Sequence, residues 1–141
     1  MTPSSNVTRR PVPTGQVVGA IAVAGLSAAA WFAWMAWDSE YQVDPVTQVA
    51  SGPYETWQVV GCGVSLIVVF VAALVLRVRP VFASVALVVA FTAAWTWTAS
   101  RADQTGLVGV GAIMVATGLS MATAVGSWVA LVVSHRRRAV R

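Results

Sequence analysis

Long apolar stretches separated by short polar ones dominate the pattern of this 141-residue chain. Four of the apolar stretches contain no Asp, Glu, Lys or Arg: residues 16–37, 57–76, 81–98 and 107–134. An α-helix rises about 1.5 Å per residue and the hydrocarbon core of a bilayer is about 30 Å thick, so each stretch can cross it. The pattern predicts an all-α, polytopic membrane protein, with an antiparallel bundle of four transmembrane helices over residues 16–134.

The two ends of the chain are polar. Residues 1–15 contain three prolines, which disfavour a helix, so we expect a tail there, and residues 135–141 form a second, basic tail. Adjacent arginines at residues 9–10 also permit a twin-arginine signal, and residues 28–30 permit a signal-peptide cleavage site. We favour a retained first helix, because its apolar run outlasts a usual signal core and cleavage would leave a tryptophan-rich N-terminus.

The longest polar segment between spans, residues 38–56, contains four of the five carboxylates of the chain. Within it, Asp44 and Pro45 favour a turn. Residues 41–43 and 48–50 lie on either side of this turn and can pair as a short hairpin. We therefore expect a structured loop between the first two spans.

Proline also predicts where two helices begin. Gly52 can cap the second helix, Pro53 suits its first position, and Glu55 suits its first turn, where the helix dipole favours an anion. Pro80 is expected to open the third helix. Residues 100–105, between the third and fourth spans, are predicted to form a short loop.

Arginine is distributed unevenly along the chain. Four spans place both termini on one side, and that side receives eight of the nine arginines, including the two in the turn at residues 77–79. The other side receives Arg101 and all five carboxylates. Basic residues are retained in the cytoplasm, so we expect both termini in the cytoplasm and residues 38–56 outside the cell membrane. Six of the seven tryptophans fall toward the outer side, as in an interfacial belt.

Composition supports a chain dissolved in lipid. Hydrophobic residues make up 57% of it, charged residues 10%, and its mean hydropathy is +0.74. A soluble domain usually carries about 25% charged residues. The net charge of +4 sits in short clusters beside the spans, which indicates topology signals and no nucleic-acid surface. Arginine without lysine, with abundant Ala, Val and Gly, suggests a GC-rich genome such as that of an actinobacterium.

Few residues offer chemistry. No charged residue lies within a span, whereas small four-span multidrug exporters depend on a membrane-embedded Glu. The single His, His135, cannot supply the two axial ligands of a membrane haem, and Cys62 lies in a span, where it behaves as a small hydrophobe. We expect no enzyme activity, no cofactor and no metal site. A calcium site in the acidic loop is the alternative to a solvated surface.

The loop of residues 38–56 and its flanks combine carboxylates with aromatic rings. Acidic groups can steer a basic partner and aromatic groups can anchor it, so we expect a partner contact here. The alternative is a solvated cap over the helix ends. The candidate contact residues are Asp38, Glu40, Tyr41, Asp44, Tyr54, Glu55 and Trp57.

The fourth span carries small residues at helical spacing. Small residues permit close approach of helices, and Ser or Thr can form hydrogen bonds across the contact. We predict that the small side faces other helices, that the bulky side with Met114 and Met121 faces lipid, and that this span is the packing centre. The candidate packing residues are Gly118, Ala122, Gly126, Ser120, Thr123 and Ser127.

These features favour a non-catalytic function. We expect an accessory or structural subunit that packs against a larger membrane complex or self-assembles, with the lipid bilayer and membrane proteins as partners. The alternative is a transport or pore-forming, holin-like protein in which Ser120, Thr123 and Ser127 line a path after oligomerisation.

Overall fold

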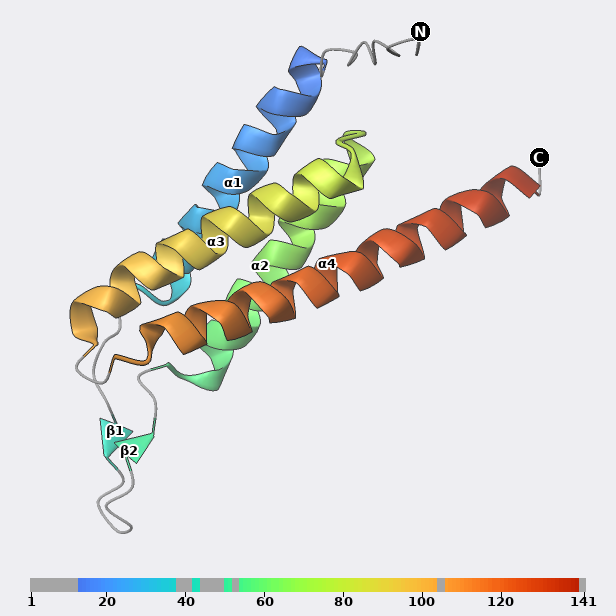
Figure 1. Cartoon of the computed structure of the whole chain (residues 1–141). Coiled ribbons are helices and arrows are strands. Elements are labelled where there is room, and N and C mark those ends of the chain that lie inside the picture. Colours follow the sequence, from blue (N-terminus) through green and yellow to red (C-terminus); the bar gives the residue numbers. More distant parts are fainter. Residues whose placement is uncertain (1–12, 38–41, 44–49, 52–53, 104–105, 140–141) are drawn as a thin grey trace, which may run out of the picture.

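The structure, a computed structural model, describes residues 13–37, 42–43, 50–51, 54–103 and 106–139. Within these residues the chain is helical apart from one short strand pair (Figure 1). The elements are α1 (Thr14–Trp34), β1 (Gln42–Val43), β2 (Ala50–Ser51), α2 (Thr56–Val75), α3 (Pro80–Ala102) and α4 (Val108–Ala139). All four helices are long and apolar enough to cross a membrane, which confirms the prediction of four apolar helices.

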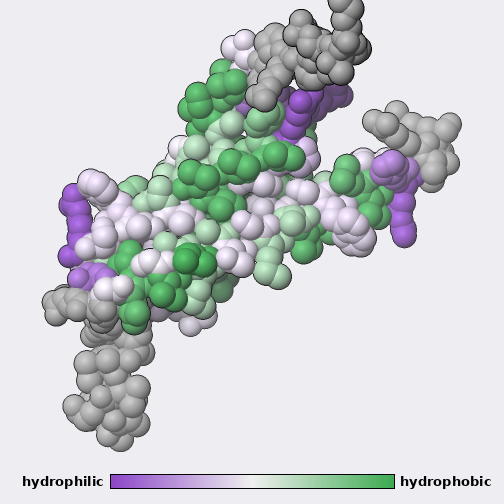
Figure 2. Space-filling model, in the orientation of Figure 1, coloured by the Kyte–Doolittle hydropathy of each residue, from purple (hydrophilic) through white to green (hydrophobic). Residues whose placement is uncertain are grey.

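The outward faces of the helices are apolar. Ile67, Val89 and Met114, one from each of three helices, are exposed by 64%, 61% and 70%. Figure 2 shows apolar surface along the helices and strongly hydrophilic surface at their ends. Soluble monomers rarely expose a contiguous apolar patch larger than a few hundred Å². This surface is the one expected of a multi-pass membrane protein.

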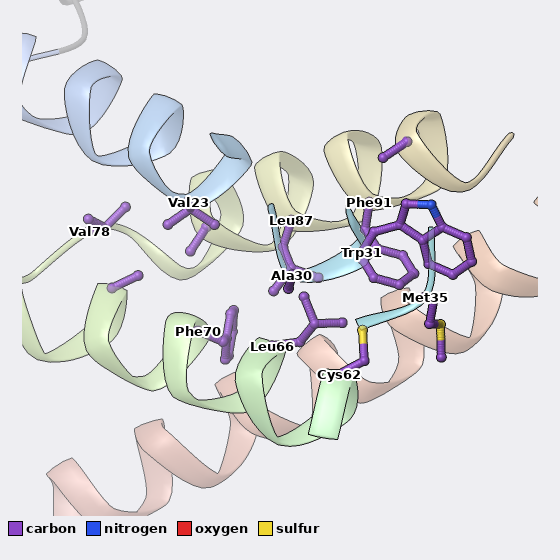
Figure 3. Packing of buried hydrophobic residues seen from close by; sticks show 13 residues of the cluster. Val23, Ala30, Trp31, Met35, Cys62, Leu66, Phe70, Val78, Leu87 and Phe91 are labelled. Atoms are coloured by element: carbon purple, nitrogen blue, oxygen red, sulfur yellow. The ribbon is translucent and has the colours of Figure 1, made fainter. Parts of the chain in front are cut away.

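The centre of the molecule is the contact between α1 and α3, which is the most extensive of the helix pairs. Figure 3 shows the buried side chains of α1, α2 and α3 that meet there. From α4, Val115 and Leu119 pack against this core but are only partly buried. The labelled core residues are Val23, Ala30, Trp31, Met35, Cys62, Leu66, Phe70, Val78, Leu87 and Phe91.

The start of α2 differs from the prediction. The predicted capping residues Gly52 and Pro53 lie outside the described residues, and α2 begins at Thr56 with Glu55 as its N-cap. Glu55 and Gln58 form a capping box, in which the Glu55 side chain accepts from the Gln58 N–H and the Gln58 Oε1 accepts from the Glu55 N–H at 2.6 Å. Glu55 is therefore the cap itself and not a residue of the first turn.

α3 begins at Pro80, as predicted, but it continues to Ala102 and absorbs the first part of the predicted loop at residues 100–105. Arg101 consequently lies in the last turn of α3. Its guanidinium sits 4.6 Å from the centroid of the Trp97 ring, one helical turn away. This cation–π contact supports the extra turn.

The α2–α3 turn is held against the start of α1 by Gln16. The Gln16 Nε2 donates to the carbonyl oxygen of Arg77 at 3.0 Å, and its Oε1 accepts from the N–H of Arg79 at 2.7 Å. Val78 is buried beside Gly19, where a Cβ would lie 2.6 Å from a Val78 methyl group. Arg77 has a φ of 63°, a left-handed conformation that few residues other than glycine adopt. Tertiary contacts with α1 thus shape this turn.

The short hairpin is confirmed, with its second strand extended by one residue. β1 and β2 pair antiparallel, with Gln42 opposite Ser51 and Val43 opposite Ala50. β2 thus extends one residue beyond the predicted second strand, whose residues 48 and 49 lie outside the described residues. Figure 1 places this hairpin at the end of the helices opposite the α2–α3 turn.

α4 is the least buried helix, which corrects the expectation that it is the packing centre. Among its described side chains only Thr123 is buried, at 6% exposure. Near its start Gly111 lies against the ring of Trp95 in α3, and further along a Cβ on Gly126 would lie 3.1 Å from Phe70 in α2. Figure 1 shows α4 diverging from α1 toward its C-terminal end. Small residues permit another helix to approach closely, but they do not determine which helix does so.

Candidate functional site

Aromatic side chains gather where α1 ends and α2 begins. Trp31 is the centre of this aromatic cluster: it is 2% exposed, and its ring makes edge contacts with Tyr54 and Phe91 at centroid distances of 5.7 and 5.6 Å. Its Nε1 donates to the Thr98 Oγ1 at 3.0 Å, which satisfies the buried indole N–H. One side chain therefore joins α1, α3 and the segment before α2.

Trp34 joins α1 to α2 in the same cluster. Its Nε1 donates to the Ser65 Oγ at 3.0 Å, and its ring lies edge-on to Trp57 with 5.9 Å between centroids. The ring also covers Gly61, where a Cβ would lie only 2.6 Å from the Trp34 Cζ3. Close approach of α1 and α2 thus requires a glycine at this position.

The beginning of α2 closes the cluster. The Trp57 Nε1–H donates to the Glu55 Oε2, and Glu55 also caps the helix. Gln58 is 1% exposed. A carboxylate at a helix N-terminus is favoured by the helix dipole. Glu55, expected to meet a partner, is therefore engaged by its own chain.

The predicted loop contacts divide into two groups. Tyr54, Glu55 and Trp57 come together around the aromatic cluster, and Tyr54 and Trp57 keep exposures of 37% and 53%. The other candidates lie outside the described residues, as does the acidic part of the loop considered for calcium. Among the described residues no group of three or more His, Cys, Asp or Glu can hold a metal. The undescribed candidates are Asp38, Glu40, Tyr41 and Asp44.

Tryptophan burial departs from the interfacial-belt expectation. Trp31 is buried, and Trp34 and Trp95 are half-buried. Trp31 continues the buried face of Val23 and Ser27 at four-residue spacing, a face that the sequence alone does not distinguish from the other apolar faces of this helix. An interfacial belt requires exposed tryptophans, and those that are exposed are Trp37, Trp57, Trp97 and Trp128.

The predicted packing residues of α4 lie on three different sides of the helix. Thr123 is buried and Gly126 and Ser127 are half-buried, so these three face the rest of the chain. A Cβ on Gly118 would meet nothing within 4 Å. The remaining three are exposed on two sides of the helix: Gly118 and Ala122 lie about 40° apart and form what we call the small face of α4, whereas Ser120 lies about 160° from both.

The hydroxyl groups of α4 donate to their own helix. The Ser120 Oγ donates to the Ala116 carbonyl at 2.7 Å, the Thr123 Oγ1 to the Leu119 carbonyl at 2.9 Å, and the Ser127 Oγ to the Thr123 carbonyl at 2.7 Å. Such bonds satisfy a hydroxyl without water. Only oxygen lone pairs remain to accept a hydrogen bond from another molecule.

A groove of about 550 Å³ lies between α3 and α4, on the side of Ala116. Thr92 lines it, and the Thr92 Oγ1 is buried without a hydrogen-bond partner among the described residues. Ala116 is one turn from Ser120, so the groove adjoins Ser120. The groove is lined by Val88, Val89, Thr92, Ala93, Thr96, Trp97, Ser100 and Ala116.

Comparison with known proteins finds no relative for this arrangement. No protein-family model, no curated protein and no solved structure matches the chain. The function is therefore inferred from the surfaces of the chain itself.

Proposed function

We propose that the chain is a non-catalytic membrane protein that assembles laterally, as an accessory or structural subunit, with another membrane protein or with copies of itself. The observation that carries the proposal is the small face of α4. In lipid, helices gain nothing from hiding apolar surface, so association depends on close packing and on hydrogen bonds between helices. The exposed face of Gly118 and Ala122 supplies the first of these requirements.

The groove between α3 and α4 offers a second surface for lateral contact. It adjoins Ser120 on the other side of α4, and Thr92, which lines it, has a buried hydroxyl without a partner among the described residues. A buried polar atom left without a hydrogen bond is costly, and a donor or acceptor from a neighbouring helix would relieve that cost. We therefore propose this groove as a second contact surface of α4, beside Ser120.

We further propose the topology in which the four helices cross antiparallel, with both termini in the cytoplasm. The Arg77 and Arg79 turn and Arg136 lie at one end of the helices, whereas Glu55 and Asp103 lie at the other. This charge separation supports retention of the arginine end on the cytoplasmic side of the cell membrane. The loop of residues 38–56 then lies outside, where the exposed parts of Tyr54 and Trp57 are available to a partner.

The test compares two alanines that differ only in the face they occupy. Ala122 and Ala124 are both exposed, and two helical residues place them about 200° apart around α4. Ala122→Leu should abolish co-purification of a partner in mild detergent, or cross-linking between copies, while Ala124→Leu should preserve both. Equal results for the two variants would contradict lateral assembly through the small face.

Reconstitution distinguishes a subunit from the pore-forming alternative. Pure protein in liposomes should leave them tight to ions if it is a subunit. An ion leak that Ser120→Ala reduces would instead support the pore. The burial of Thr123 disfavours a continuous path of the three hydroxyls in one chain.

A further inference from the structure

A second groove, of about 280 Å³, lies between α1 and α3 at the end of the α2–α3 turn. It extends along residues 16–24 of α1, a rise of about 12 Å. One leaflet of a bilayer contributes about half of a hydrocarbon core that is about 30 Å thick. The groove thus matches the depth of a single leaflet and is too short for a complete transmembrane helix. It is lined by Gln16, Val17, Ala20, Ile21, Ala24 and Phe82.

Gln16 connects this groove to two cationic side chains. It lines the groove, and its amide group bonds the backbones of Arg77 and Arg79 at 3.0 and 2.7 Å. Both arginines are exposed. The hydrogen bonds hold the turn, so the backbones of both arginines lie at the mouth of an apolar groove. Figure 2 shows the resulting junction of hydrophilic and apolar surface at this end.

No described carboxylate is placed to neutralise these arginines. Glu55 caps the start of α2 and Asp103 the end of α3, so both lie at the opposite end of the helices from the turn. Guanidinium groups bind phosphate oxygens in pairs of parallel hydrogen bonds. An anion supplied by another molecule can therefore bind at this turn.

We propose that Arg77, Arg79 and the α1–α3 groove bind one anionic phospholipid, with its phosphate at the guanidinium groups and one acyl chain in the groove. The inference rests on the membrane topology proposed above, which places this turn in the leaflet that carries anionic lipids. The length of the groove along α1, which matches one leaflet, favours a lipid over a partner helix. The paired positive charge favours an anionic headgroup.

The experiment uses the full chain in detergent and native mass spectrometry with phosphatidylglycerol or phosphatidylcholine. The wild-type protein should retain phosphatidylglycerol preferentially. Arg77→Gln and Arg79→Gln should each weaken that retention roughly fivefold, the effect of one basic residue near an anionic surface. Arg136→Gln, at the exposed end of α4, should not change it. Equal loss in all three variants, or no preference in the wild type, would overturn the proposal.

A second pair of variants tests the groove. Ala24 lines it and is half-buried, whereas Ala22 is exposed about 200° away on α1. Ala24→Leu should reduce retention of phosphatidylglycerol, and Ala22→Leu should not. Glycerol phosphate, which carries the anion without an acyl chain, should fail to displace the lipid; full displacement would show a headgroup site without a groove.

Flotation separates failure of this inference from failure of the membrane placement on which it rests. All variants should float with vesicles of either lipid, because membrane insertion does not depend on the site. Loss of flotation by the wild-type protein would refute the membrane placement itself. Normal flotation without a preference for the anionic lipid would refute only the lipid site.

Discussion

α1 and α4 are comparably apolar, yet they lie in different environments. Their most hydrophobic windows have the same mean hydropathy, but about a fifth of that window is buried in α1, against 6% in α4. α1 contacts α2 and α3 extensively, whereas α4 contacts mainly α3. Hydrophobicity therefore does not decide which helix forms the core of this molecule.

Specific contacts account for the difference. α1 carries two indole N–H groups that find hydroxyl partners on other helices, Trp31 on Thr98 and Trp34 on Ser65. The three hydroxyls Ser120, Thr123 and Ser127 of α4 instead bond their own backbone. Because apolar burial gives no advantage in lipid, shape complementarity and interhelical hydrogen bonds determine which helices form the core.

The largest expected effect is at Trp31. Trp31→Ala removes the ring contacts with Tyr54 and Phe91 and the hydrogen bond to Thr98. We expect the free energy of unfolding to fall by about 3 kcal/mol, which is at the lower end of the range for truncating a buried tryptophan. The loss is small for such a change because the side chains of separated helices remain in apolar surroundings. Thermal denaturation in detergent measures it. Trp128→Ala, at an exposed site of α4, should change stability little, and a comparable loss there would break the comparison.

Gly61 sharpens the comparison at one close approach. Gly61→Ala puts a methyl group 2.6 Å from the Trp34 ring, so we expect a loss of about 2 kcal/mol from overpacking. Gly63 on the same helix has nothing within 4 Å of its Cβ position, so Gly63→Ala should be neutral or slightly stabilising. The same denaturation assay decides, and equal shifts in Tm would refute the role assigned to Trp34.

Gln16 tests whether the α2–α3 turn depends on α1. Gln16→Ala removes both hydrogen bonds to the turn, at an exposed site, and should cost about 1 kcal/mol. Val18→Ala provides a control at an exposed neighbour on α1. Hydrogen exchange of the Arg79 amide should accelerate in the Gln16 variant alone; unchanged exchange would mean that the turn holds its shape by itself.

The smallest effect on stability is expected at the small face of α4. Gly118→Leu should change the free energy of unfolding by no more than about 0.5 kcal/mol, because its Cβ meets open space. Gly126→Leu, facing Phe70, should cost about 1 kcal/mol or more. If Gly118→Leu greatly lowered the stability of the monomer, α4 would after all be the packing centre of the molecule.

The pattern of polar and apolar residues alone determined the number and approximate limits of the helices. A helix that can cross a bilayer is a local property of about 20 successive residues, and Pro80 opens α3 because proline needs no N–H partner at that position. The short hairpin also followed from local turn chemistry. Glu55 as a cap was missed because Gly52 and Pro53 offered an equally good local solution, and the reciprocal bond with Gln58 decides between them.

Only the tertiary structure decided how the helices face one another. Trp31 and Trp128 are the same residue in similarly apolar helices, but one is 2% and the other 66% exposed. The small residues of α1 and α2 at Gly19 and Gly61 receive Val78 and Trp34, whereas Gly118 receives nothing from its own chain. The physical reason is that lipid solvates every apolar face of a helix almost equally. The rotation of each helix about its axis, and the helix it packs against, therefore depend on complementary side chains that are distant in the sequence.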